Sequence, residues 1–344
     1  MIARAAAVAN WQRTLGDAVS SVGELLDLLA LAPESLPPHL RPAEAAAREF
    51  PLRVPRGFVA RMRPGDPADP LLLQVLPTTA ELVAVPGYTA DPLAEVNEDA
   101  AASPVPGVLH KYRGRALLLV TGACGVHCRY CFRRHFPYGE HAPRGDGWGA
   151  ALDWLAANPA VEEVILSGGD PLAVSDEKLA RLVEALDAIP HLRRLRLHTR
   201  MPVVLPERVD DALVSWLGGL RLSKVVVLHA NHAQEIDGTV SAAVARLRAA
   251  GAAVLNQAVL LARVNDSVAA QCELSRALFA AGALPYYLHL LDRVTGAAHY
   301  EVSEARAREL LHGVMAELPG YLVPRLVREV PGAPFKVPLE LGAG

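Results

Sequence analysis

Three of the chain's four cysteines, Cys124, Cys128 and Cys131, lie within eight residues of one another. Thiolates at such spacings hold iron–sulfur clusters, because a short loop can wrap several sulfur atoms around one cube. A [4Fe–4S] cube with three thiolates keeps one iron open, as catalytic metal sites do. A zinc site would need a fourth ligand, and His127 lies inside the loop, where four groups could hardly converge. A disulfide would leave an odd thiol and is typical of secreted chains, so the spacing predicts an open-iron cluster.

Two other stretches carry residues that could take part in chemistry. Ser167-Gly168-Gly169-Asp170 follows an apolar run, and paired glycines let backbone N–H groups approach a ligand closely. A plain tight turn would have the same composition. Lys336 lies among prolines and apolar residues. A lone lysine is usually a solvated charge, but these neighbours favour a fixed, partly desolvated amine of the kind that Schiff-base chemistry requires.

The elements that must position these residues alternate between short apolar runs and helical patterns. Six runs fit buried parallel strands: 116–121, 161–166, 192–198, 225–229, 253–259 and 286–291. Helical patterns separate and follow them, at about 148–157, 175–188, 207–218, 239–250, 266–282 and 303–317. This alternation predicts an α/β fold with right-handed βαβ crossovers, arranged as a partial (β/α)6 barrel that is open on one side.

Polar residues lie at or follow the ends of these runs, except Gln257, which lies within the fifth run. In chain order they are the cysteine loop, Ser167–Asp170, His198–Arg200, His229, Gln257 and Asp292. Parallel barrels carry their functional groups on the loops at the C-terminal strand ends. We therefore expect these side chains to meet at one mouth of the barrel.

The barrel accounts for residues 106–320, which leaves two flanking segments. Residues 1–105 predict helices at 10–32 and near 43–50, followed by proline-punctuated loops. A capping-box pattern at Ser21–Glu24 allows two helices in the first of these stretches. We see no charged active-site cluster in this segment and interpret it as structural. Residues 321–344 form a short C-terminal segment that carries Lys336.

Composition narrows the possible partners and location. The 344 residues include 34 Lys and Arg against 37 Asp and Glu, a net charge of −3, which gives no electrostatic reason to expect a nucleic acid partner. No run of 18 apolar residues predicts a membrane span, and the N-terminus does not resemble a secretion signal. Few cysteines, three of them clustered, fit a reducing cytoplasm.

The loop Cys124–Arg134 resembles the cluster-binding loop of radical SAM enzymes. The resemblance implies that the open iron binds S-adenosylmethionine (SAM), which an electron from the cluster cleaves to methionine and a 5′-deoxyadenosyl radical. Further stretches resemble lysine 2,3-aminomutase: 103–107, 110–115, 256–257, 264–266, 286–292 and 331–338. The match runs from about residue 69 to 338 and implies pyridoxal phosphate (PLP) as a third cofactor.

Matching positions imply roles at the cofactors. Lys336 matches the lysine that forms a Schiff base with PLP, and Lys111 and Arg115 match basic residues that hold its phosphate. The residues implied to bind SAM are Ser167, Gly168, Gly169, Asp170, His229 and Gln257.

The same resemblance implies how the substrate is held. Arg133 matches the arginine that pairs with the substrate carboxylate, and Asp292 and Glu329 match two acids that bind its distal ammonium group. Two acids favour L-lysine and argue against glutamate 2,3-aminomutase, whose substrate has an anionic tail. The implied reaction moves the α-amino group of lysine to Cβ after hydrogen abstraction there, with an external reductant of the flavodoxin or ferredoxin type.

Some features depart from the general pattern. Glu329 stands where the aminomutases carry Asp, and the sequence ends eight residues after Lys336, so we expect no C-terminal zinc site. These features and the stretch Trp11–Leu15 resemble the branch that makes (R)-β-lysine for a ligase that attaches it to elongation factor P. The alternatives are an aminomutase making free β-lysine for metabolism, a radical SAM enzyme without PLP, and an electron carrier.

Overall fold

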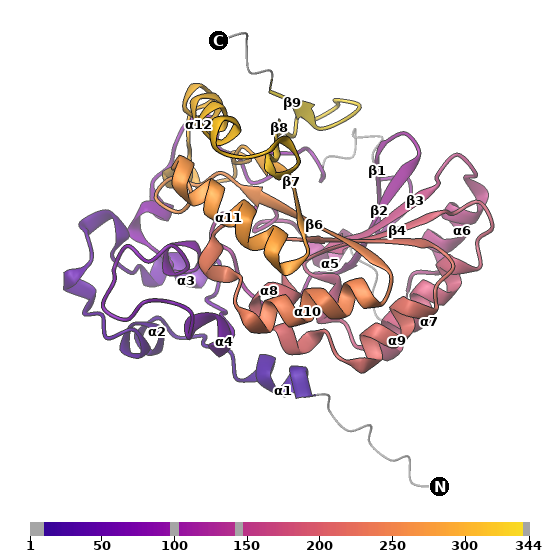
Figure 1. Cartoon of the computed structure of the whole chain (residues 1–344), viewed down its shortest axis with the longest axis horizontal. Coiled ribbons are helices and arrows are strands. Elements are labelled where there is room, and N and C mark those ends of the chain that lie inside the picture. Colours follow the sequence, from indigo (N-terminus) through magenta and orange to yellow (C-terminus); the bar gives the residue numbers. More distant parts are fainter. Residues whose placement is uncertain (1–9, 97–102, 142–146, 340–344) are drawn as a thin grey trace, which may run out of the picture.

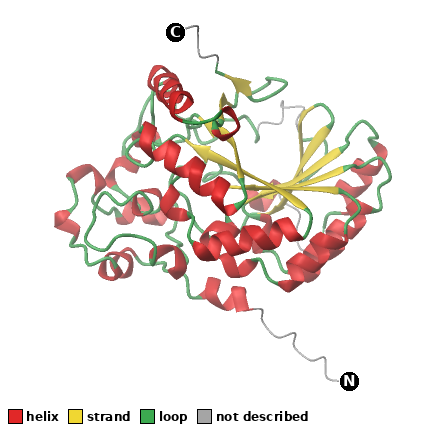
Figure 2. Ribbon diagram, in the orientation of Figure 1, coloured by secondary structure: helices red, strands yellow, loops and turns green. Residues whose placement is uncertain are grey.

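The computed structural model describes residues 10–96, 103–141 and 147–339. Nine strands of this part of the chain form one curved sheet, in which they lie in the order of the sequence (Figures 1 and 2). Their bounds are β1 Val108–Tyr112, β2 Arg115–Thr121, β3 Glu163–Gly168, β4 Arg194–Thr199, β5 Ser223–Leu228, β6 Ala252–Val259, β7 Leu284–His289, β8 Arg325–Arg328 and β9 Val337–Pro338.

Strand pairing defines a partial barrel. Each neighbouring pair from β2 to β8 is parallel, while β1 pairs with β2 and β9 pairs with β8 in the antiparallel sense. β1 and β9 therefore form the two edges of the sheet. The six predicted strands are confirmed as β2 to β7. The barrel also has a seventh parallel strand, β8, which the prediction of six strands lacked.

Helices cover the outer side of the sheet (Figure 2). The six predicted crossover and C-terminal helices are confirmed as α6 Gly149–Ala157, α7 Asp176–Asp187, α9 Asp211–Gly219, α10 Gly238–Ala249, α11 Val268–Ala281 and α12 Glu304–Glu317. Side-chain caps fix where four of them, α9 to α12, begin. The Ser267 hydroxyl accepts from Ala270 N at the start of α11, which ends at Gly282 in the left-handed conformation (φ 93°). Two short helices, α5 Tyr138–His141 and α8 Met201–Val204, complete the barrel.

The N-terminal segment forms four short helices beside the barrel, coloured indigo to purple in Figure 1. They are α1 Asn10–Gly16, α2 Val22–Leu28, α3 Glu44–Glu49 and α4 Arg56–Val59. Ser21 caps α2 by accepting from Glu24 N at 3.5 Å, so the predicted stretch 10–32 is two helices. No helix of the described residues is long and apolar enough to cross a membrane.

One hydrophobic core joins the three predicted segments. Buried side chains such as Trp11, Leu118 and Leu326 belong to the same cluster. The predicted segment boundaries at residues 105 and 320 stay predictions. The ends of the first and last predicted segments, residues 1–9 and 340–344, lie outside the described residues. The shared core means that the N-terminal segment can place side chains directly against the barrel.

Candidate active site

A cavity of about 280 Å³ lies among the C-terminal ends of the parallel strands. All predicted site residues line it: Lys111, Arg115, Cys124, Cys128, Cys131, Arg133, Ser167, Gly168, Gly169, Asp170, His229, Gln257, Asp292, Glu329 and Lys336. The expectation that these residues meet at one mouth of the barrel is therefore confirmed. Their individual roles stay predictions.

The three clustered cysteines are free thiols on the loop after β2. Burial, followed by the charge of Cys128, raises the pKa of Cys131 to about 11. Within the described ranges, no three His, Cys, Asp or Glu side chains are grouped closely enough for a single metal ion. All three thiols line the cavity, which suits a cluster of several irons, and binding of such a cluster would displace their protons.

Gly168, the last residue of β3, and Gly169, which follows it, allow the cysteine loop to pack closely. A Cβ on Gly169 would lie 2.4 Å from the carbonyl oxygen of Ala123, and one on Gly168, whose φ is 118°, would lie 2.5 Å from that of Thr121. Gly169 N donates to Thr121 O at 2.7 Å, and Asp170 N donates to Ala123 O at 2.8 Å. These N–H groups hold the cysteine loop, so they are not free to approach a ligand as the sequence suggested.

Asp170 connects the ends of neighbouring strands. Its buried carboxylate accepts from Thr199 Oγ1 at 2.7 Å, from Arg200 N at 2.7 Å and from Leu172 N at 3.0 Å. Burial raises its pKa despite these donors. The carboxylate therefore braces the turn after β3 against the end of β4, and any contact of Asp170 with SAM stays a prediction.

Three arginines of the cysteine loop have different environments. Arg129 and Arg134 donate to the buried carboxylate of Glu81, with Nη2–Oε2 distances of 2.6 and 2.8 Å. Arg133 instead lines the cavity and pairs with Glu95. Glu81 thus holds Arg129 and Arg134 of the cysteine loop in place. Of the three arginines, Arg133 is the one that lines the cavity.

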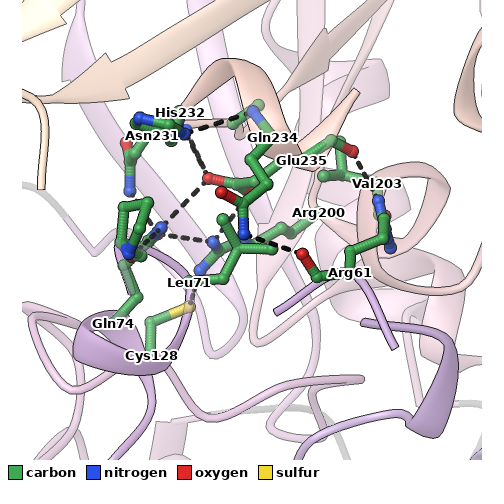
Figure 3. Close-up of polar contacts among 12 residues, drawn as sticks. Arg61, Leu71, Gln74, Cys128, Arg200, Val203, Asn231, His232, Gln234 and Glu235 are labelled. Atoms are coloured by element: carbon green, nitrogen blue, oxygen red, sulfur yellow. Dashed lines mark hydrogen bonds and ion pairs between the residues drawn. The ribbon is translucent and has the colours of Figure 1, made fainter. Parts of the chain in front are cut away.

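A buried polar network supports Cys128 from the outer side of the cavity (Figure 3). Arg200 Nη1 donates to Cys128 Sγ at 2.8 Å, and Nη2 donates to Gln74 Oε1 at 2.7 Å and to Glu235 Oε2 at 2.9 Å. Asn231 Nδ2 donates to the same Gln74 oxygen at 2.9 Å. The network thus joins the N-terminal segment, the end of β4 and the loop after β5 to one candidate cluster ligand.

Histidines form another part of the wall. His229 Nε2 lies 2.8 Å from Gln257 Nε2, an amide nitrogen that can only donate, so the ring nitrogen accepts. Burial, followed by the charge of Arg200, lowers the pKa of His229 to about 3, in keeping with a neutral ring. The Nε2 atoms of His198 and His289 are buried without a hydrogen-bond partner, although both residues line the cavity. Such groups call for polar atoms of a bound molecule.

Lys336 is far from the three cysteines in the sequence, but its side chain lines the same cavity. Its ammonium group pairs with the Glu329 carboxylate, which also lies 3.5 Å from Lys111 Nζ and accepts from the Tyr112 hydroxyl at 3.2 Å. Burial alone would raise the pKa of Glu329, but the charges of Lys336 and Lys111 lower it to about 2. Glu329 is therefore a fixed anion among these cations.

Asp292, beyond the end of β7, is the second acid of this region. Burial and the neighbouring charge of Glu329 raise its pKa to about 7, against the opposing effect of Lys336. A cation entering the cavity would relieve this repulsion. Asp292 therefore holds its proton more tightly than an exposed carboxyl group would.

Several residues of this cavity carried no sequence prediction. Glu95 pairs with Arg133 and Lys111, Tyr286 and Tyr287 place their rings 3.8 Å apart, and Arg115 lies over the Tyr112 ring. Tyr286 and Tyr287 begin a predicted strand, so the rule for C-terminal strand ends could not find them, and only the resemblance of 286–292 pointed to this stretch. Glu95 lies in an irregular segment, where an acid gives no signal by itself.

The fold and cavity define a partial α/β barrel with charged and polar side chains gathered at its C-terminal strand ends. Over 332 residues the chain is 48% identical to L-lysine 2,3-aminomutase of Escherichia coli (strain K12), covering 96% of this chain and 95% of the relative. The enzyme of the same name from Haemophilus influenzae is 46% identical over 327 residues, which cover 95% and 94% of the two chains. The chain therefore belongs to the L-lysine 2,3-aminomutase family and is an isomerase.

Other comparisons add less. No family model matches the chain. The crystal structure of a radical SAM methyltransferase from Sphaerobacter thermophilus is similar at a TM-score of 0.47 and 21% identity, covering 64% of this chain and 68% of that one.

Proposed function

We propose that the chain is a SAM- and PLP-dependent isomerase that uses a [4Fe–4S] cluster to convert L-lysine to (R)-β-lysine. The observation that supports this most is that one cavity joins three free thiols to a lysine paired with an acid. The names of the relatives add lysine as the substrate. Separate sites for the thiols and Lys336 would have argued against a radical acting on a PLP-bound amino acid.

The chain's residues suit these groups. Cys124, Cys128 and Cys131 would hold the cluster, and Lys336 would bind PLP. The unpartnered Nε2 atoms of His198 and His289 would meet polar atoms of the bound molecules.

Further residues complete the two cofactor sites. Lys111 and Arg115 would hold the phosphate of PLP, because clustered cations favour a dianion. His229 and Gln257, which already contact each other, would face SAM together with the residues after β3.

Opposite charges at the two ends of the cavity would orient lysine. Arg133 would pair with the substrate carboxylate, and Asp292 and Glu329 would receive the distal ammonium group. Lys336 Nζ shows that the Glu329 carboxylate accepts a primary ammonium group in this cavity. A substrate held at both ends presents a fixed Cβ, which lowers the entropic cost of reaction.

When bound, the cluster with SAM supplies a radical that removes a hydrogen atom from Cβ, and PLP supplies the π-system that lets nitrogen migrate. The protein's part is to hold the reacting atoms and to exclude water. Arg133 and the two acids fix the ends of the substrate, and the neutral ring of His229 adds no charge beside SAM. Apolar side chains of the cavity wall, such as Leu117, Ile165 and Val259, would help to keep bulk water from the reacting atoms.

We further propose that the product is attached to elongation factor P by a separate ligase, that a flavodoxin or ferredoxin supplies the electron, and that the enzyme works in the cytoplasm. The longer acid at position 329 and the stretch Trp11–Leu15 support this branch. The competing function is production of free β-lysine for metabolism. Turnover distinguishes them, because an enzyme that supplies a protein modification can be slow, whereas one that supplies metabolism must sustain a larger flux of β-lysine.

Anaerobic reconstitution with iron, sulfide, PLP, SAM and a reductant tests the central activity. Wild type should show PLP absorbance and form β-lysine. Lys336→Ala should lose both but keep the SAM-dependent change in the cluster's EPR signal, whereas Lys224→Ala, near the N-terminal end of β5, should match wild type. β-Lysine output from Lys336→Ala equal to wild type would contradict the PLP assignment. Absence of a SAM-dependent EPR change in wild type would favour an electron carrier.

A further inference from the structure

Glu95 is a buried acid on the cavity wall for which the function described so far has no use. Its carboxylate accepts from Arg133 Nε at 2.7 Å and from Arg133 Nη2 at 2.9 Å. Lys111 Nζ donates to the same carboxylate at 2.8 Å. The side chain is 4% exposed, so this contact is shielded from water. One carboxylate therefore joins the cation proposed for the substrate to a cation proposed for the PLP phosphate.

The backbone around Glu95 is held in place. The Asp91 carboxylate accepts from Glu95 N and Val96 N, each at 2.9 Å. Upstream, Thr89 N donates to Arg293 O at 3.0 Å and Thr295 N donates to Thr89 O at 2.9 Å. The segment that carries Glu95 is thus tied to the segment that carries Asp292. Because the backbone on both sides of Glu95 is held by hydrogen bonds, the position of its carboxylate beside Arg133 is fixed by the fold.

The ion pair with Glu95 uses one edge of the Arg133 guanidinium group and leaves another edge available. Glu95 takes the Nε–Nη2 edge of Arg133. Nη1 has only long contacts, at 3.4 Å to Ser167 Oγ and to Gly168 O. A guanidinium can serve two carboxylates at two edges, because its five N–H groups lie in one plane. A second carboxylate would therefore approach at the Nη1 side.

We propose that Glu95 is a positioning residue that fixes the plane of Arg133 so that its Nη1 side receives the substrate carboxylate. By pairing with Lys111 as well, Glu95 sets the distance between the carboxylate site and the phosphate site. The inference rests on the proposed function, since it assumes an amino acid held beside PLP. It also gives the N-terminal segment a direct part in substrate recognition.

The test compares two ligands in protein loaded with cluster and PLP, by the change in PLP absorbance on titration. L-Lysine carries the carboxylate, while 1,5-diaminopentane has both amines without it. Glu95→Gln should reduce the ratio of lysine affinity to diamine affinity about tenfold, because the neutral amide cannot hold both Arg133 nitrogens. Glu95→Asp should recover part of the ratio, and Glu177→Gln, an exposed acid on α7, should leave it unchanged.

The outcomes separate the inference from the proposed function. A wild-type ratio in Glu95→Gln overturns the positioning role, and so does an equal loss for both ligands, which would indicate a general structural effect. Absence of any lysine-dependent absorbance change in wild type overturns the proposed function itself. In steady state, the positioning role predicts a raised KM for lysine in Glu95→Asp with unchanged iron and sulfide content.

Discussion

Arg200 Nη1 lies 2.8 Å from Cys128 Sγ, in a network that is closed off from water by Gln74 and Glu235. A positive donor at a sulfur ligand stabilises the reduced, more negative state of an iron–sulfur cluster. Through this contact, Arg200 at the end of β4 would raise the reduction potential of the proposed cluster. The contact has consequences that can be measured apart from turnover.

We expect Arg200→Gln to lower the midpoint potential of the reconstituted cluster by about 60 mV, which is a tenfold change for a one-electron couple. Arg200→Lys keeps the charge and should show a smaller decrease. EPR-monitored redox titration measures both. Arg194→Gln changes a half-buried arginine at the start of β4, at the end of the strand away from the cysteine loop, and should not alter the potential. A wild-type potential in fully loaded Arg200→Gln would refute this role.

Gly169→Ala should disturb the cysteine loop. The new Cβ would lie 2.4 Å from Ala123 O, which is backbone and cannot swing away as a side chain could. Overpacking of this kind costs about 1–3 kcal/mol. Anaerobically reconstituted Gly169→Ala should hold several-fold less iron and sulfide than wild type, by chemical analysis. Gly149→Ala, where a Cβ meets nothing within 4 Å, serves as the control, and equal iron content in both variants would show that the close packing is unimportant.

Lysine affinity should depend on the ionisation of Asp292. Its pKa of about 7 means that the carboxyl is largely protonated below that pH and charged above it. Only the charged form attracts the distal ammonium group, which stays protonated throughout. The dissociation constant for lysine should therefore fall as pH rises from about 6 to 8, and it should lose this dependence in Asp292→Asn. A pH dependence that persists in the variant would assign it to another group.

The same carboxyl should reduce the stability of the cofactor-free protein at high pH. Its folded pKa lies above its usual value of 3.8, so the folded state binds the proton more tightly, and the free energy of unfolding falls as pH rises between these values. The difference in free energy of unfolding between Asp292→Asn and wild type should thus be about 2 kcal/mol more in favour of the variant at pH 8 than at pH 5. Thermal unfolding measures this, with Asp211→Asn as an exposed control. A difference independent of pH would contradict the raised pKa.

The regular elements of the barrel could be predicted because each has its own local pattern. Buried strands such as β3 contain an apolar run, here Val164 to Leu166, and helices such as α11 begin at a capping serine. β8 was missed because Arg325–Arg328 places only two apolar residues between charged ones. Its strand pairing comes from its neighbour β7, which no local pattern can indicate.

For the site, too, local sequence patterns could indicate some features and not others. Cysteine spacing and position after a strand indicated where the functional groups lie, because the C-terminal ends of parallel strands meet. The partners of those groups could not be predicted. The pairing of Glu95 with Arg133 joins residues 38 positions apart through an irregular segment. The contact of Asp170 with SAM stays a prediction. Its hydrogen bonds with Thr199 and Arg200 N could not be predicted, because tertiary packing sets them.

The central claim is that the SAM-derived radical and a PLP-bound lysine meet in the one cavity bounded by Cys124–Cys131 and Lys336. The most direct measurement uses L-lysine deuterated at Cβ with the reconstituted enzyme and follows the label by mass spectrometry. We predict deuterium in 5′-deoxyadenosine and in β-lysine. Unlabelled 5′-deoxyadenosine formed alongside β-lysine, or labelled 5′-deoxyadenosine in undiminished amounts from Lys336→Ala, would contradict it.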